Sequence, residues 1–415
     1  MTTIEIISIE NIKPSSKTPQ HLKTFNLSVL HQLIPAPYAP VIFFYPNQDH
    51  AAEIQIDEQL KISLAQTLTR FYPLAGTIKD DLSIDCDDSG AYYATARVNT
   101  SLVEFLNHLG LGSINQFLPC DPAFARSNAG TRVTNVQVNI FKCGGLAVSL
   151  CISHKILDGA ALATFVKCWA SIHQAVRLSS TCIEELVYPD LTTCFLPAND
   201  SRLRDSSMAM WASFIKFGKC STSRFVFNRF ALAKLKAEAA RKGVEQPTRV
   251  EVVSALLWKC VMVASKEQDG FNKPSLLSHV VNLRRRSGST LAENSIGNLV
   301  WLATAEFESI TDDIKQHDLV NQVRRSILEI NTEFVTKLQD DERQNAMEES
   351  LKLMKDCSPM FTDFVVLMDT RYGDGIEAWV NMDEHKMHIL QHDPKLLAFT
   401  SLDPSPLQMC EVDND

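Results

Sequence analysis

The 415-residue sequence lacks the patterns of several common protein classes. With 40 basic and 49 acidic residues, its formal net charge is −9, so it has no excess of the basic side chains that bind nucleic-acid phosphates. No stretch is both long and uncharged enough to span a bilayer. Glu5 and Glu10 interrupt the apolar residues at the N-terminus, where a secretory signal would lie. We therefore expect a cytoplasmic protein with no nucleic-acid or membrane partner.

Metal and nucleotide motifs are also absent. The 11 cysteines include no CxxC pair, which disfavours a zinc site, and their scattered positions suit a reducing compartment. There is no P-loop, no GxGxxG and no GxSxG nucleophile elbow. The turn at 369–375 contains aspartates and glycines but not the spacing of a calcium loop. We predict no metal site and no permanently bound cofactor.

Composition and length indicate a folded protein of two domains. Hydrophobic residues make up 45% of the chain and charged residues 21%, as in globular proteins. A single core rarely serves 415 residues. A segment rich in proline and serine near position 195 has little periodicity, which is typical of a crossover. We predict an N-terminal domain at 1–190, a linker at 191–220 and a C-terminal domain at 221–415.

Local patterns alternate between strands and helices, which indicates α/β layers. Residues 133–141 and 146–152 are rich in β-formers and are separated by Gly144 and Gly145, so we predict that they pair. Residues 83–86 and 92–98 flank a turn at 88–90 and predict a hairpin.

Three helices are predicted with similar clarity. From Gly159 onward, apolar residues recur at helical spacing as far as Ile172. Thr248 and Glu251 form a capping-box pattern at the start of a second helix. Residues 319–338 read as one long amphipathic helix.

The segment from Ser153 to Gly159 is the sharpest candidate for chemistry. A strand ends just before His154, and a helix begins just after Asp158, the arrangement at which α/β proteins tend to place reactive groups. Histidine is a natural general base near neutral pH, and a nearby aspartate can fix the loop. Alternatively, Asp158 is only the N-cap of the helix, and His154 is a satisfied histidine at a strand end. These residues alone leave both interpretations open.

A basic segment follows the strand that we predict at 280–283. Arg284, Arg285 and Arg286 can be read as a solvated turn. Alternatively, one arginine pairs with Asp158 from the other domain, and the others meet the phosphates of a cofactor, because guanidinium groups match carboxylate and phosphate geometry.

Taken together, these motifs resemble the BAHD acyltransferase family of plants, in particular its alkaloid-acylating branch. The resemblance covers nearly the whole chain. It rests on the motifs at Phe71–Gly76, Asp85–Gly90, His154–Gly159, Thr248–Lys259, Val281–Arg284, Leu367–Arg371 and Gly373–Trp379.

The resemblance implies an α/β fold of two similar chloramphenicol-acetyltransferase-like domains, with mixed sheets flanked by helices and a channel between the domains. His154 would be the base. An acyl group, acetyl in the first place, would pass from acyl-CoA to a hydroxyl or amine of an alkaloid or terpenoid. Asp158, Gly159 and Arg284 would support the catalytic loop, and Ser254, Gly297 and Asn298 would lie on the CoA side. Relatives of this kind are usually monomers.

One departure from the family pattern concerns the C-terminal third. The sequence contains no Asp-Phe-Gly-Trp-Gly, which the family carries before the segment matching Leu367–Thr370, and residues 348–364 offer no substitute. The resemblance implies that this loss exposes a sheet edge and opens the active site to water. Three alternatives to a working transferase therefore stay open: an impaired splice-type variant, a pseudoenzyme that binds a ligand or partner, and an acyl-CoA hydrolase.

Overall fold

The computed structural model groups the chain into two compact units. It describes residues 2–34, 37–47, 53–107, 111–120, 129–179, 187–192, 219–288, 291–308, 314–339, 345, 347 and 363–405. The first unit consists of Met1–Met208, Asn282–Val300 and Leu338–Arg343, and the second of Ala209–Val281, Trp301–Lys337 and Gln344–Asp415. The domain boundaries given above stay a prediction, and most of the linker at 191–220 lies outside the described residues.

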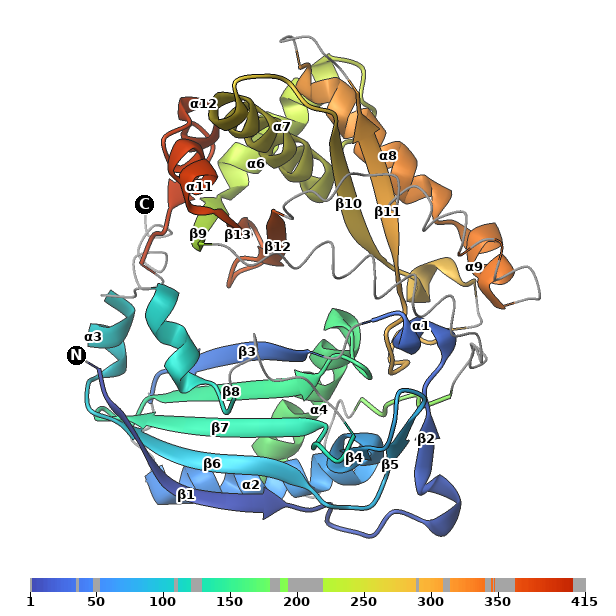
Figure 1. The fold of residues 1–415 in the computed structure, drawn as a ribbon. Coiled ribbons are helices and arrows are strands. Elements are labelled where there is room, and N and C mark those ends of the chain that lie inside the picture. The colour runs from blue at the N-terminus through green and yellow to red at the C-terminus, as the bar shows by residue number, and fades with distance from the viewer. Residues whose placement is uncertain are drawn as a thin grey trace. The chain divides into compact units, whose positions relative to one another are not determined.

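A mixed five-stranded sheet forms the centre of the first unit (Figure 1). Its strand order is β1-β6-β7-β8-β3; β6 and β7 are parallel, and the other neighbours are antiparallel. A smaller sheet has the order β2-β5-β4. The strands are β1 (Ile4–Ile12), β2 (Thr24–Asn26), β3 (Tyr38–Tyr45), β4 (Thr77–Ile78), β5 (Ser83–Asp85), β6 (Ala91–Val98), β7 (Thr134–Phe141) and β8 (Leu146–Ser153).

Two long helices, α2 (Glu53–Arg70) and α4 (Gly159–Arg177), cover one face of this sheet (Figure 1). Every second residue of β8, from Leu146 to Ile152, enters the same core as the buried face of α4, because side chains alternate across a strand. On α4, Phe165 and Trp169 are spaced to share that buried face. The unit also contains α1 (Val29–Gln32), α3 (Leu102–Asn107) and the 3-10 helices Gln20–Leu22, Tyr72–Ala75, Leu111–Phe117 and Arg284–Arg286.

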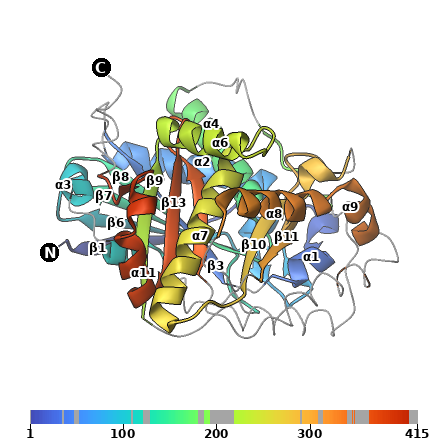
Figure 2. The same ribbon diagram turned by 90° about the horizontal axis from the view of Figure 1, so that it is seen from above.

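The second unit has an antiparallel four-stranded sheet with the order β12-β13-β9-β14, and a separate pair, β10 and β11. Apolar residues of α7, β9 and β13 form one core, and α7 packs against α6, α8 and α11 (Figure 2). The elements are α6 (Arg229–Arg241), α7 (Arg249–Asp269), α8 (Gln316–Glu329), α9 (Thr332–Gln339), α11 (Glu384–Gln391), α12 (Pro394–Leu397), β9 (Cys220–Phe227), β10 (Ser275–Asn282), β11 (Val300–Phe307), β12 (Phe364–Asp369), β13 (Ile376–Asp383) and β14 (Ser401–Leu402).

The predicted capping box opens α7. The Thr248 hydroxyl accepts from the backbone N–H of Glu251 at 3.2 Å, and the Glu251 carboxylate accepts from the backbone N–H of Thr248 at 2.8 Å. Arg324 of α8 pairs with the same carboxylate at 2.7 Å. This cap therefore also joins α7 to α8.

The predicted α/β class is confirmed, and so are the antiparallel pairing of β7 with β8 and the helix that begins at Gly159. The predicted hairpin at 83–98 is wrong, because β5 pairs with β2 and β4 whereas β6 pairs with β1 and β7. The single helix predicted at 319–338 is also wrong, since α8 ends at Glu329 and α9 starts at Thr332. The segment 348–362, where the missing motif was sought, lies outside the described residues.

No described helix has the length and apolar character needed to cross a membrane.

Histidines removed from water make the fold sensitive to mild acid. Burial, and secondarily the charge of Arg284, lowers the pKa of His31 to about 3, and partial burial lowers the pKa of His173 and His279. An unfolded histidine titrates near pH 6.5, so below that pH the unfolded chain binds protons that the folded chain excludes. Their contribution to stability is complete above about pH 6.5 and is lost as the pH falls toward the folded pKa.

For His31 alone, we expect the free energy of unfolding to fall by about 2 kcal/mol between about pH 6.5 and about pH 5. Thermal unfolding of the wild type and of His31→Gln, followed by circular dichroism at both pH values, measures this loss. The variant should lose less of its Tm on acidification. An equal loss in the two proteins would show that His31 is not held neutral by the fold.

Candidate active site

The predicted base lies in a tight turn between β8 and α4. His154 directly follows Ser153, the last residue of β8, and α4 begins five residues later. The backbone N–H of His154 donates to the carbonyl of Pro37 at 2.9 Å, so the turn is tied to the start of the edge strand β3. The His154 side chain is half-buried. The strand end therefore fixes the backbone of His154, while the residue as a whole stays partly accessible.

Asp158 is both the N-cap of α4 and the ion-pair partner of Arg284, so capping and fixing the loop are two roles of one side chain. Its Oδ1 accepts from the backbone N–H of Ala161 at 2.8 Å, which caps α4. Arg284 donates to Oδ2 at 2.8 Å and to Oδ1 at 3.1 Å, a two-pronged contact. The backbone N–H of Leu299 donates to Oδ2 at 2.9 Å. All of these bonds hold the loop, and none involves the imidazole of His154.

Arg284 is 2% exposed, and all three of its guanidinium nitrogens make hydrogen bonds. Besides Asp158, they donate to the carbonyl of Ser295 at 2.8 and 3.0 Å and to the carbonyl of Gly297 at 3.1 Å. The side chain of Asn282 accepts a further bond at 3.2 Å. Arg284 belongs to the same compact unit as Asp158. It therefore fastens the segment at 295–297 to the His154 loop within one unit.

Gly297 and Asn298 lie against the His154 loop. The side-chain amide of Asn298, which is fully buried, donates to the backbone carbonyl of His154 at 2.6 Å. The carbonyl of Gly297 accepts from the backbone N–H of Asp158 at 3.4 Å. Gly297 has a φ of +147°, a conformation that favours glycine. Two of the three residues predicted on the CoA side are thus direct neighbours of the loop that carries the base.

Two buried polar atoms of this cluster have no hydrogen-bond partner in the described part of the chain. They are Nδ1 of His154 and Oδ1 of Asn298. They belong to two residues already joined through the His154 carbonyl. A buried donor or acceptor without a partner costs free energy. A side-chain rotation or a bound ligand that supplies the missing hydrogen bonds is therefore expected at these two atoms.

Lys155 is a supporting residue that the sequence analysis did not identify. Its side chain is buried, and Nζ pairs with Oδ1 of Asp81 at 2.8 Å. Asp81 lies 74 positions earlier, in the turn before β5. No local pattern could reveal the partner. The contact ties the residue after His154 to the small sheet.

Two other predicted residues are placed differently. Gly159 is the exposed first residue of α4, and a Cβ there would meet nothing within 4 Å, so its surroundings give no steric reason for glycine. Ser254 lies on α7 in the second unit, and its hydroxyl is 2.9 Å from Nε2 of His279. Among the described residues, no cluster of histidine, cysteine or acidic side chains could hold a metal ion.

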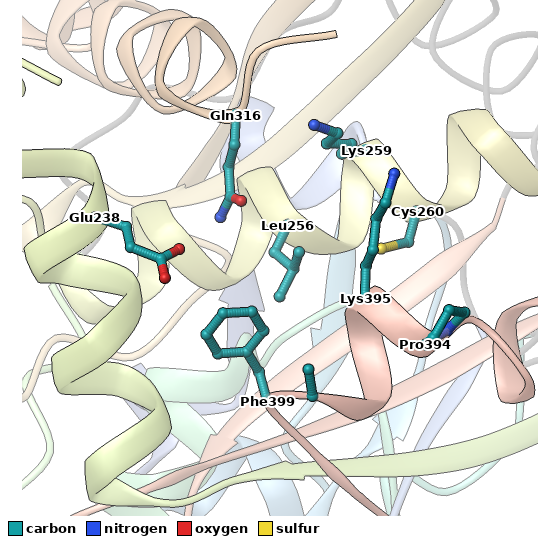
Figure 3. Close-up of a pocket in the computed structure, with 9 residues that line it drawn as sticks. Glu238, Leu256, Lys259, Cys260, Gln316, Pro394, Lys395 and Phe399 are labelled. Atoms are coloured by element: carbon teal, nitrogen blue, oxygen red, sulfur yellow. The ribbon is translucent and has the colours of Figure 1, made fainter.

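A pocket of about 400 Å³ lies among α6, α7, α8 and α12 (Figure 3). Leu256 and Phe399 give it apolar walls, and Glu238, Lys259 and Lys395 place charges around it. All of its lining residues belong to the second unit, and none is a predicted site residue. Nothing in the lining connects this pocket with the predicted chemistry.

Comparison with known proteins identifies the family. The model of the Transferase family matches residues 2–362. The chain is 37% identical to a limonoid 7-O-acetyltransferase of Citrus sinensis, with 97% of this chain and 99% of the relative covered. It is 33% identical to stemmadenine O-acetyltransferase of Catharanthus roseus, with 94% and 96% covered. The crystal structure of vinorine synthase is 28% identical, covers 96% of this chain and 99% of its own, and superposes with a TM-score of 0.80.

The Citrus alignment also bears on chain length. It extends over 462 positions, whereas this chain has 415 residues, so the relative contains residues without a counterpart here. The match nevertheless covers 97% of this chain in sequence and 96% in fold. The chain therefore belongs to the BAHD family of acyl-CoA-dependent acyltransferases.

Proposed function

We propose that this protein transfers an acetyl group from acetyl-CoA to a hydroxyl or amine of a plant specialised metabolite, an alkaloid or a terpenoid, with His154 as the general base. The relatives support the substrate class, because their names describe the O-acetylation of limonoids and of stemmadenine. The observation that carries the proposal is the position of His154. Its imidazole is half-buried at a strand end, on a loop that a buried ion pair holds in place.

The reaction follows from that position. His154 removes the proton from the acceptor hydroxyl or amine as the oxygen or nitrogen attacks the thioester carbonyl of acyl-CoA. The resulting tetrahedral oxyanion collapses, the carbon–sulfur bond breaks, and the CoA thiolate leaves. The protonated His154 returns the proton to the thiolate. The base is thereby regenerated, and the products are an ester or amide and free CoA.

A general base needs one ring nitrogen that carries no proton. A hydrogen bond to Asn298 would decide which of the two ring nitrogens of His154 that is. The unpartnered Oδ1 of Asn298 is an acceptor, and the unpartnered Nδ1 of His154 can carry the proton. We propose that Nδ1–H donates to this amide oxygen after rotation of the His154 ring. Nε2 then presents its lone pair to the acceptor.

Asp158 has a different role in this proposal from the aspartate of a catalytic triad. Both of its carboxylate oxygens are occupied by Arg284 and by the backbone N–H groups of Ala161 and Leu299. It therefore cannot orient the imidazole directly, as a triad aspartate does. Its contribution, with Arg284, is to hold the loop.

The remaining assignments belong to the proposal and rest on the family resemblance. Acyl-CoA and a small alcohol or amine are the binding partners, and Ser254, Gly297 and Asn298 lie on the CoA side. The protein acts as a cytoplasmic monomer of two domains.

Acyl-CoA hydrolysis is a second candidate reaction. The sequence lacks the Asp-Phe-Gly-Trp-Gly motif, and the aligned Citrus relative contains residues without a counterpart in this chain. A less enclosed site admits water, which competes with the acceptor for the same thioester.

The two reactions are separated by measuring free thiol release from acetyl-CoA, with and without a panel of alkaloid and terpenoid alcohols. For transfer, release depends on an acceptor and falls by at least about 10²-fold in His154→Ala, since a general base contributes about 10²–10⁴. His385→Ala, which changes an exposed histidine of α11, is the control and should match the wild type. Turnover retained in His154→Ala would remove His154 as the base, and release without any acceptor would indicate hydrolysis.

Arg284→Gln leaves the carboxylate of Asp158 buried and uncompensated. We expect it to lower the free energy of unfolding by about 3–5 kcal/mol and to reduce turnover, because the loop loses its anchor. Arg285→Gln is a matched control, since Arg285 is an exposed neighbour that pairs with the exposed Glu293, and it should lie within about 0.5 kcal/mol of the wild type. Equal stability of the two variants in chemical denaturation would contradict the proposed role of Arg284.

A further inference from the structure

The single-turn helix α1 is buried beside the candidate active site. All four of its residues, Val29 to Gln32, are removed from solvent. Ser28 stands at the N-cap position, yet its side chain makes no capping bond. Its hydroxyl instead lies 2.6 Å from Nδ1 of His31. A residue type favoured as an N-cap is thus used to hold an imidazole ring.

The other edge of the His31 ring faces Gly297. A Cβ built on Gly297 would lie 2.8 Å from Nε2 of His31 and 2.9 Å from its Cε1, both closer than normal contact. The ring therefore occupies the space that any larger residue at 297 would need. The edge of Phe25 also contacts the ring, with centroids 6.4 Å apart. His31 is 1% exposed, and its Nε2 has no hydrogen-bond partner among the described residues.

The residues next to Gly297 reach the loop that carries His154. Asn298 donates to the carbonyl of His154 at 2.6 Å, and Leu299 donates to Asp158 at 2.9 Å. In the same segment, the carbonyls of Ser295 and Gly297 accept from Arg284. The backbone at Gly297 thus lies between the His31 ring and the bonds that fix the loop.

We propose that His31 is a positioning residue for the base: its ring, held by Ser28, packs on Gly297 and keeps the amide of Asn298 against the carbonyl of His154. The inference rests on the proposed function, because positioning has meaning only if His154 performs the chemistry. Without the ring, the backbone at 297 can move into the vacated space and carry Asn298 away. A shift of about 1 Å in a catalytic group can cost as much as 10²-fold in rate.

Kinetics with acetyl-CoA and the panel alcohol that gives the fastest release test this inference. We expect His31→Ala to lower kcat by about 10-fold and to change the KM for acetyl-CoA by a smaller factor, because the loss falls mainly on the position of the base. His31→Gln, which keeps a polar group of similar reach, should restore part of the rate. Ser28→Ala should lower kcat by a smaller factor, and its effect should nearly vanish in the His31→Ala background, because both changes affect one contact.

Gln32→Leu separates positioning from simple stability. Gln32 is buried in the same turn and donates to the carbonyl of Leu27 at 3.1 Å. The variant should lower Tm but leave the kcat of the folded protein unchanged. A fall in kcat that follows Tm equally in both variants would make His31 merely structural and overturn the inference.

A crystal structure of His31→Ala gives an independent readout that does not require turnover. The distance from Asn298 Nδ2 to the His154 carbonyl should exceed the hydrogen-bond range of about 3.2 Å. If His31→Ala does not fold, the structure of Ser28→Ala is used for the same measurement. An unchanged distance, or wild-type kcat in a folded His31 variant when His154→Ala is inactive, would overturn the inference alone. Activity in His154→Ala would instead overturn the proposed function.

Discussion

The buried ion pair between Asp158 and Arg284 is the interaction on which the site depends. Two charges removed from water are tolerated only when their remaining hydrogen-bonding capacity is also satisfied. Here Arg284 meets that demand with the carbonyls of Ser295 and Gly297, and Asp158 with two backbone N–H groups. The electrostatic requirement therefore joins the turn after β8 and the segment at 295–299, more than 120 positions apart, into one cluster.

This arrangement explains why the base and the aspartate of the same loop have separate tasks. Since both oxygens of Asp158 are occupied, it cannot share a proton with His154, and the other bonds that hold the loop come from elsewhere. Asn298 approaches from the far segment, and Lys155 fastens the next residue to Asp81. The loop is held from several sides while the imidazole stays partly accessible, which is what a base that must meet two substrates requires.

The sequence predicted what local chemistry decides. The β7–β8 pair, the start of α4 and the capping box of α7 follow from patterns within a few residues, and the structure contains all three. The hairpin at 83–98 was wrong because β6 takes its partners from distant strands. The break between α8 and α9 has a local signal in the sequence, because Asn331 caps the second helix by accepting from the backbone N–H of Phe334 at 3.0 Å.

The site was predicted in the same uneven way. His154, Asp158 and Arg284 stand in recognisable motifs, and the structure brings them into one unit. The contact of Asn298 with His154 spans 144 positions, and the packing of His31 on Gly297 joins segments still further apart. Such contacts depend on tertiary packing, so no local sequence pattern predicts them.

A double-mutant cycle between Asp158 and Arg284 tests the account most directly. The free energy of unfolding is measured for the wild type, Asp158→Asn, Arg284→Gln and the double variant, which needs no knowledge of the acceptor. If the ion pair organises the cluster, each single substitution leaves one buried charged side chain without its partner. The loss of unfolding free energy in the double variant should then be smaller than the sum of the two single losses by at least about 2 kcal/mol. Additive losses would show that the two side chains act independently and that the loop is held by other means.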